Sequence, residues 1–326
     1  MSEPVDVGGP YFEDLAVGQV FDAAPGTTLT EGRAAVHQAI TGERWRLALD
    51  HHLAREVVGA PVASPGLVWN AAIGQTTLVT HRVRANLFYR RLALLRQPLI
   101  GDTLRTVTTV VGLRENTRRE GRALTGLAAL RMRTVDQEGR EVLDFYRCAM
   151  VPLRPDAAPT GHCDDLDVIG ADLPAVPVES LVPDWDREAF GVGRSVSDLP
   201  ESGSVLQVAT GDVVTSAPEL ARLTLNLAAV HHDRFAAGGR RLVYGGHTIA
   251  VAASQLTRVL PDLVTVLAWE SCDHLGPVHE GDTLRARITV GAPSPAFGWR
   301  TVPLRVKVVA DDERPVLDWR LTALAP

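Results

Sequence analysis

The stretch from Tyr244 to Leu260, YGGHTIAVAASQLTRVL, could stabilise a developing negative charge. Apolar residues recur there at spacings of three and four, which predicts a helix over 246–260. Because glycine has no side chain, Gly245 and Gly246 would let other groups approach the first backbone N–H groups closely. Those N–H groups, with the helix dipole behind them, suit an enolate oxygen. The simpler alternative is a tight turn that leads into a core helix.

Two polar residues upstream, Asn226 and His231, could complete a site at this helix end. A neutral histidine near pH 7 can take a proton from water. An amide cannot take a proton, but its carbonyl oxygen can hold the water molecule. The alternatives are a core or surface histidine at His231 and a polar helix-end residue at Asn226.

The elements that would position these residues occur twice. LIGDTLRTVTTVVG at 99–112 returns as VHEGDTLRARITVG at 278–291, and EVLDFYR at 141–147 returns as PVLDWRL at 315–321. The glycine entry to the helix recurs as Ser64-Pro65-Gly66. Several matches in the same order predict two similar domains in tandem.

Each half is expected to hold a central helix, at 66–79 and at 246–260, followed by antiparallel strands rich in β-branched residues. We predict an α+β fold in which each sheet wraps its own helix and the two sheets form one continuous surface. The expected domains are 1–154 and 196–326, the second holding the site. They are joined by a Pro-, Asp- and Ala-rich linker at 155–195.

Composition narrows the classes of function. The 326 residues are 45% hydrophobic and 22% charged, with no apolar run long enough to cross a bilayer. A net charge of −6 without a basic cluster argues against nucleic acid as a partner. Three widely spaced cysteines and an N-terminus without a signal-peptide pattern predict a cytoplasmic protein. We find no metal, nucleotide or flavin motif.

The run LTLNLAAVHHDRFA at 223–236, followed by RRLVYGGHT, resembles the signature of the MaoC-like acyl-CoA dehydratases and R-specific enoyl-CoA hydratases. In that signature a Gly-Asp-x-Asn-Pro-Leu-His-x-Asp run precedes a helix that opens with His-Gly. YFEDLAVGQVF at 11–21 and the VLDFYR strand also look like family features. The layout resembles members that fuse two hotdog domains in one chain. The resemblance therefore implies a double hotdog fold.

The resemblance also implies roles for single residues. His231 falls on the signature histidine, and Asn226 falls where most members have the catalytic Asp. Leu225 replaces the preceding glycine of the signature. Asn226 is similar to the Thr-x-Asn form of the run in mesaconyl-CoA hydratase-like proteins. The resemblance makes Gly245, Gly246 and Tyr244 candidates for binding the substrate or its oxyanion.

The first half departs further from the signature. Glu43 sits at the Asp position, but Ala48 replaces the histidine. We therefore expect this half to be structural and to shape the acyl pocket. His247 is expected to be structural, and His274 and His279 to lie at the surface.

We favour a hydratase or dehydratase that acts on an α,β-unsaturated acyl-CoA or acyl-carrier thioester, with no cofactor. One alternative is a non-catalytic acyl-binding or scaffold protein. The other is a thioesterase, which would need a carboxylate near the central helix. The two halves would form an intramolecular pseudo-dimer, and two chains could associate further as a homodimer. We expect no membrane partner.

Overall fold

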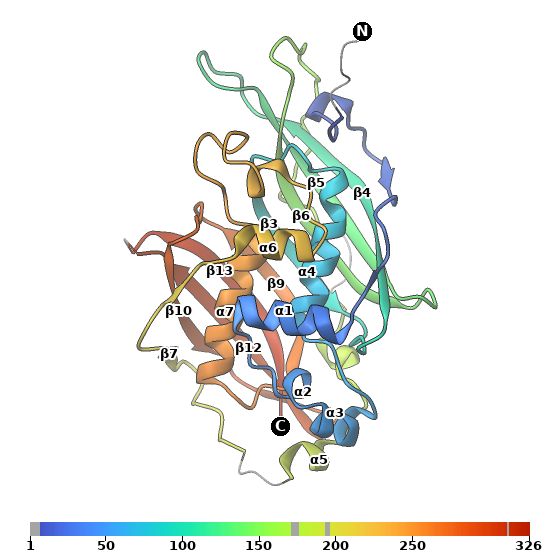
Figure 1. Ribbon diagram of the computed structural model, residues 1–326, viewed down its shortest axis with the longest axis vertical. Coiled ribbons are helices and arrows are strands. Elements are labelled where there is room, and N and C mark those ends of the chain that lie inside the picture. Colours follow the sequence, from blue (N-terminus) through green and yellow to red (C-terminus); the bar gives the residue numbers. More distant parts are fainter. Residues whose placement is uncertain (1–6, 171–175, 193–195, 312) are drawn as a thin grey trace.

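The computed structural model describes residues 7–170, 176–192, 196–311 and 313–326. In it, 13 strands form one antiparallel sheet that curves around two central helices (Figure 1). The sheet order is β1-β4-β5-β6-β3-β9-β13-β12-β10-β7. The predicted α+β layout, with two sheets merged into one surface, is confirmed.

The α-helices are α1 (Glu31–Thr41), α2 (Arg46–Leu49), α3 (His51–Val58), α4 (Pro65–Gln75), α5 (Arg187–Gly191), α6 (Ala217–Leu223) and α7 (Gly245–Val259). The longer strands of the first half are β3 (Ala85–Leu94), β4 (Thr103–Glu115), β5 (Thr125–Val135) and β6 (Glu141–Pro152). Those of the second half are β9 (Thr265–His274), β10 (Thr283–Val290), β12 (Trp299–Val309) and β13 (Pro315–Ala325). Short edge strands are β1 (Val20–Phe21), β2 (Thr27–Thr28), β7 (Val205–Gln207), β8 (Asp212–Val213) and β11 (Ser294–Ala296).

The halves meet at the antiparallel pair β3 and β9, where Tyr89 pairs with Cys272 and Leu92 pairs with Trp269. Reading outward from this seam gives equivalent strands in the same order on both sides. The junction is therefore that of an isologous dimer held in one chain, and each half covers the other's sheet edge.

The two central helices lie next to each other inside the curved sheet (Figure 1). Every residue of α4 is buried, as expected for a helix that is apolar on all sides. Gln75 of α4 donates to the Leu104 carbonyl at 2.9 Å, and Gln255 of α7 donates to the Leu284 carbonyl at 2.8 Å. These equivalent bonds tie each helix to its own sheet. The helix predicted at 66–79 ends at Gln75 and continues as a 3₁₀ turn, η2 (Thr76–Leu78).

The segment predicted as a linker is mostly exposed or half-buried, but single residues anchor it to the domains; residues 171–175 and 193–195 lie outside the described part. Leu166 is buried against the outer face of the sheet. Phe190 of α5 is buried with its ring 6.0 Å from that of Trp299. In the described ranges, no helix is both long and apolar enough to cross a membrane.

Candidate active site

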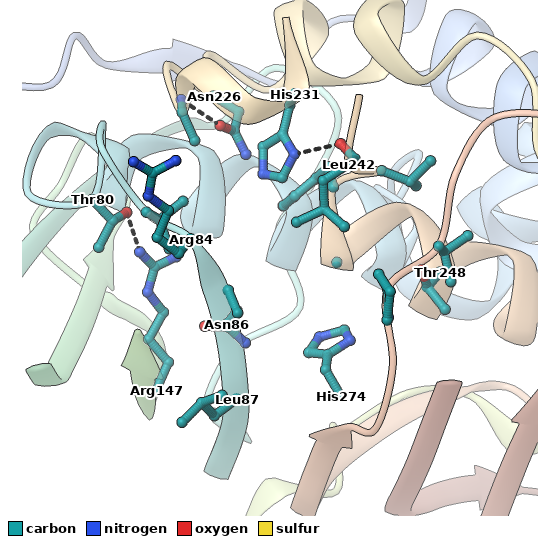
Figure 2. A pocket seen from close by; sticks show the side chains of 18 of the residues that line it. Thr80, Arg84, Asn86, Leu87, Arg147, Asn226, His231, Leu242, Thr248 and His274 are labelled. Carbon is teal, nitrogen blue, oxygen red and sulfur yellow. Dashed lines mark hydrogen bonds between the residues drawn. The ribbon is translucent and has the colours of Figure 1, made fainter. Parts of the chain in front are cut away.

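A cavity of about 280 Å³ lies between the two halves. One wall is the loop that connects α6 to α7, together with the start of α7. The opposite wall comes from the first half, through β3 and β6, and the end of β9 closes the floor (Figure 2). The second half was expected to hold the site and the first half to shape the acyl pocket, and residues of both halves line the cavity.

The α6–α7 loop is docked on the first half of the chain. The Leu227 N–H donates to Thr77 Oγ1 at 2.8 Å, and the Ala229 N–H donates to the His81 carbonyl at 3.0 Å. Gly74 of α4 lies so close that a Cβ there would be 1.7 Å from the Thr224 carbonyl oxygen. The loop also bends at Leu225, which has a φ of 60°. This is the conformation that a glycine adopts easily, and the family signature has a glycine there.

His231 is held as a neutral base. Its Nδ1 lies 2.8 Å from the Leu242 carbonyl, which can only accept, so Nδ1 carries the proton and Nε2 keeps its lone pair. The pKa of His231 is lowered to about 4, mainly by burial; the hydrogen bond to the Leu242 carbonyl opposes this shift, and the nearby charges of His232 and Arg147 add to it. The imidazole is therefore unprotonated at neutral pH and can accept a proton.

Asn226 lies beside His231 but presents a different group from the one expected. Its Oδ1 accepts a hydrogen bond from the Ala228 N–H at 2.9 Å. The backbone carbonyl of Asn226 accepts from His232 Nε2 at 2.6 Å. With Oδ1 engaged in the loop, the NH₂ group is left to face a ligand (Figure 2). We therefore assign Asn226 as a hydrogen-bond donor, where the sequence had suggested an acceptor for water.

Tyr244, Gly245 and Gly246 differ in how they lie relative to the cavity. The Tyr244 ring lines the cavity 5.8 Å from the His231 ring, but its hydroxyl donates to the Asn70 carbonyl in α4 at 3.3 Å. Gly245 lines the cavity. Gly246 faces away from it, since a Cβ there would be 2.1 Å from Asn70 Oδ1. Gly245 thus lies at the cavity wall, and Gly246 lies in the contact between α4 and α7.

His274 was expected at the surface, and this expectation is wrong. The residue ends β9 and lines the cavity, with Nε2 buried and without a hydrogen-bond partner. A Cβ at Gly245 would lie 2.7 Å from that nitrogen, so His274 covers the first turn of α7. Burial lowers its pKa to about 4. By contrast, His279 binds the Arg241 carbonyl at 2.8 Å and does not line the cavity.

The first half contributes polar side chains to the opposite wall. Arg147 of β6 and Asn86 and Tyr89 of β3 line the cavity, and Arg84 stands exposed at its rim (Figure 2). Thr80 accepts a hydrogen bond from the Arg147 guanidinium.

Glu43, the first-half counterpart of Asn226, does not line this cavity. It is buried against the start of α4, where Ser64 Oγ donates to its Oε2 at 3.1 Å. Burial raises the pKa of Glu43 to about 8, so the group is protonated at neutral pH. Ala48 packs against the hydrophobic core. The space that would mirror the cavity is apolar: Val264 and Leu267, the repeat counterparts of Arg84 and Leu87, pack in a buried cluster.

The internal repeat distinguishes the cavity residues His274, Asn86 and Arg147 from their counterparts in the other half. Repeat positions in the seam strands differ by 180, so His274 corresponds to Leu94 and Asn86 corresponds to Val266. Arg147 corresponds to Leu321 in the VLD motif. In each pair the apolar copy is buried core and the polar copy lines the cavity.

Two known proteins are similar to this chain over most of its length. The sequence is 31% identical over 330 residues to beta-methylmalyl-CoA dehydratase of Chloroflexus aurantiacus, covering 95% of this chain and 90% of the relative. It is 31% identical over 287 residues to mesaconyl-CoA hydratase of Cereibacter sphaeroides, covering 85% and 82%. No family model matches.

Two solved structures share the fold across nearly their whole lengths. A conserved hypothetical protein from Mycobacterium tuberculosis, described as a double hotdog, has a TM-score of 0.90 at 53% identity, covering 98% of this chain and 99% of that one. A putative MaoC domain protein dehydratase from Chloroflexus aurantiacus has a TM-score of 0.85 at 27% identity, covering 98% and 97%. The predicted double hotdog fold is thereby confirmed.

Proposed function

Because the chain belongs to the MaoC-like family of CoA-thioester hydratases and dehydratases, we propose that it adds water across an α,β-unsaturated acyl-CoA, or removes it in reverse. The observation that carries this proposal is His231, a buried neutral imidazole whose unprotonated nitrogen is free in a cavity between the halves.

In the hydration direction, His231 Nε2 takes a proton from a water molecule as the water oxygen bonds to the β-carbon. The electrons of the double bond move toward the thioester oxygen, which gains negative charge. The Gly245 N–H at the helix start and the Asn226 NH₂ are the nearby donors that can meet this charge or hold the water. The α-carbon then takes the proton from His231, which restores the neutral base.

This scheme explains how the site works with an amide at Asn226. A single imidazole both removes and returns the proton, so a second titrating group is not required. Asn226 contributes hydrogen bonding and, through the Ala228 N–H and His232, the shape of the loop. Every group involved belongs to the chain, so we expect activity to survive dialysis against a chelator.

The test is an assay of the purified protein on a panel of enoyl-CoAs, following the enoyl-thioester absorbance and free thiol together. Loss of absorbance without thiol release supports hydration. Thiol release would show a thioesterase, and no reaction on any member would leave the acyl-binding alternative. Running the same panel on carrier-protein thioesters would decide which pantetheine carrier is used.

A further inference from the structure

A buried cation stands in the cavity without an anionic partner. The Arg147 side chain projects inward from β6 and is only 4% exposed (Figure 2). It donates to Thr80 Oγ1 and interacts with the Tyr89 phenol, but its Nε has no acceptor. Within the described ranges, no acidic side chain pairs with it. Burying a charge without an opposite charge is unfavourable, so an arginine in this position requires an explanation.

The fold itself does not require this arginine. Asp144 of the VLD motif in β6 binds Arg131 at 3.0 Å, and Asp318 of the same motif in β13 binds Arg305 at 2.9 Å. These equivalent ion pairs show that β6 and β13 correspond to each other residue by residue at this motif. Three residues after each aspartate comes Arg147 in one half and Leu321 in the other, both buried. Leucine therefore meets the structural need of the position.

The groups around Arg147 form a polar end of the cavity. Asn86 lies on the same wall, and neither its amide oxygen nor its amide nitrogen has a partner. Its repeat counterpart, Val266, is fully buried core. Guanidinium and amide groups together supply several donors in one place, which is the chemistry that binds a carboxylate. The loop with His231 and the start of α7 occupy the other walls.

We propose that the acyl group of the substrate carries a second, free carboxylate, which Arg147 binds with Asn86 beside it. This inference rests on the proposed hydratase function and names its substrate class, the CoA thioesters of short dicarboxylic acids. The cavity of about 280 Å³ lies just below the usual range of about 300–1,000 Å³ for drug-sized ligands, which favours a short acyl group. With the carboxylate on Arg147 and the thioester at the start of α7, the double bond would lie between them, facing His231.

Pairing of Arg147 with the substrate carboxylate would also change the pKa of His231. The positive charge of Arg147 contributes to the lowered pKa of His231. A bound carboxylate would neutralise that charge and raise the proton affinity of the imidazole only when the correct substrate is present. The carboxylate of the substrate would thus contribute both to binding and to proton transfer by His231.

The first experiment measures binding without turnover. Succinyl-CoA and butyryl-CoA are saturated and differ only in a terminal carboxylate or methyl group, and calorimetry gives the dissociation constant of each. We expect the wild-type protein to prefer succinyl-CoA by about 30-fold or more, the usual effect of leaving a buried charge unpaired. Arg147→Met should bring this ratio to within about threefold. Arg133→Met, which removes an exposed arginine on β5, is the matched control and should keep it.

The second experiment measures turnover on another matched pair. The C1 thioester of mesaconate and tiglyl-CoA differ by the same exchange of carboxylate for methyl. Wild type should favour the first by its kcat/KM, whereas in Arg147→Met the ratio of the two kcat/KM values should fall to within about threefold, whatever the absolute rate on tiglyl-CoA. Arg147→Lys, which keeps a charge without the planar fork, should be intermediate. Arg147→Leu, the residue of the other repeat, replaces the methionine variant if the latter fails to fold.

Two results would overturn the inference: equal wild-type affinity for succinyl- and butyryl-CoA, or an equal loss of both ligands in Arg147→Met. The second result would place the guanidinium on the thioester or pantetheine that both ligands share. A protein that prefers succinyl-CoA through Arg147 but hydrates no enoyl-CoA would contradict the proposed function instead, so the two failures can be told apart.

Discussion

Gly74→Ala tests whether the docking of the α6–α7 loop on α4 builds the active site. The change adds one methyl group on a fully buried helix, at a point where the new Cβ would be 1.7 Å from the Thr224 carbonyl oxygen. Neither the helix nor the loop can accept this contact without moving. Asn226 and His231 follow Thr224 within the same loop, so they should move with it.

The expected change in the free energy of unfolding of Gly74→Ala follows from two opposing effects. Alanine in a helix interior is intrinsically favoured over glycine by about 1 kcal/mol. Overpacking a well-packed interior costs typically about 1–3 kcal/mol, and a contact this short belongs at the upper end. We expect a net loss of about 2 kcal/mol in the free energy of unfolding. A displacement of about 1 Å at the catalytic groups should lower kcat/KM by about 100-fold.

The assay combines urea unfolding with hydration kinetics, and the matched control is Gly32→Ala. Gly32 lies in the exposed first turn of α1, where a Cβ would meet nothing closer than 3.9 Å. That variant should be as stable as wild type or slightly more stable, with unchanged activity. The account of the docked loop is refuted if Gly74→Ala behaves like Gly32→Ala in both measurements.

Three further predictions concern the site and its environment. Asn226→Asp should lower kcat/KM by about 10²–10³-fold, because a carboxylate can still accept from the Ala228 N–H but offers no donor to the cavity; activity within about tenfold of wild type would contradict the donor role of the amide NH₂. Tyr244→Phe should cost about 1 kcal/mol of stability and little activity, since its hydroxyl bonds to the Asn70 carbonyl; a loss of turnover with unchanged stability would place that hydroxyl on the substrate instead. The free energy of unfolding should fall by about 2 kcal/mol per buried histidine between pH 7 and 5, because the unfolded chain takes up protons below pH ~6.5 that the folded protein refuses. Urea unfolding at the two pH values checks this, and a flat profile would contradict the lowered pKa values of His37, His231, His247 and His274.

The sequence was sufficient for the fold because the fold is periodic. The strands show their β-branched alternation, the GDTLR repeat fixes two halves, and α7 begins within a residue of its predicted position. α4 was predicted too long because the apolar pattern continues through Thr76–Leu78, where the backbone changes to a 3₁₀ turn. The packing of Leu166 and Phe190 could not be read from a segment with weak periodicity.

The candidate site was only partly predictable, for a physical reason. His231 and Asn226 lie in a local signature, so their positions relative to each other follow from the loop. The direction of the Asn226 amide does not, because it depends on which backbone group its oxygen bonds. His274 and Arg147 reach the cavity because the sheet places β6, β3 and β9 side by side, and sequence spacing does not encode this pairing. Comparing the repeats position by position would have exposed both.

The most direct test of the central claim is the hydration rate of His231→Gln on the best enoyl-CoA of the panel. The comparisons are wild type, Glu43→Gln and His52→Gln. His52 is an exposed residue of α3. We predict that His231→Gln folds but loses about 10²–10⁴-fold in kcat/KM, the usual effect of removing a general base, while both comparison variants keep wild-type rates. Full activity in His231→Gln together with inactivity of Glu43→Gln would contradict the account and move the chemistry to the first half of the chain.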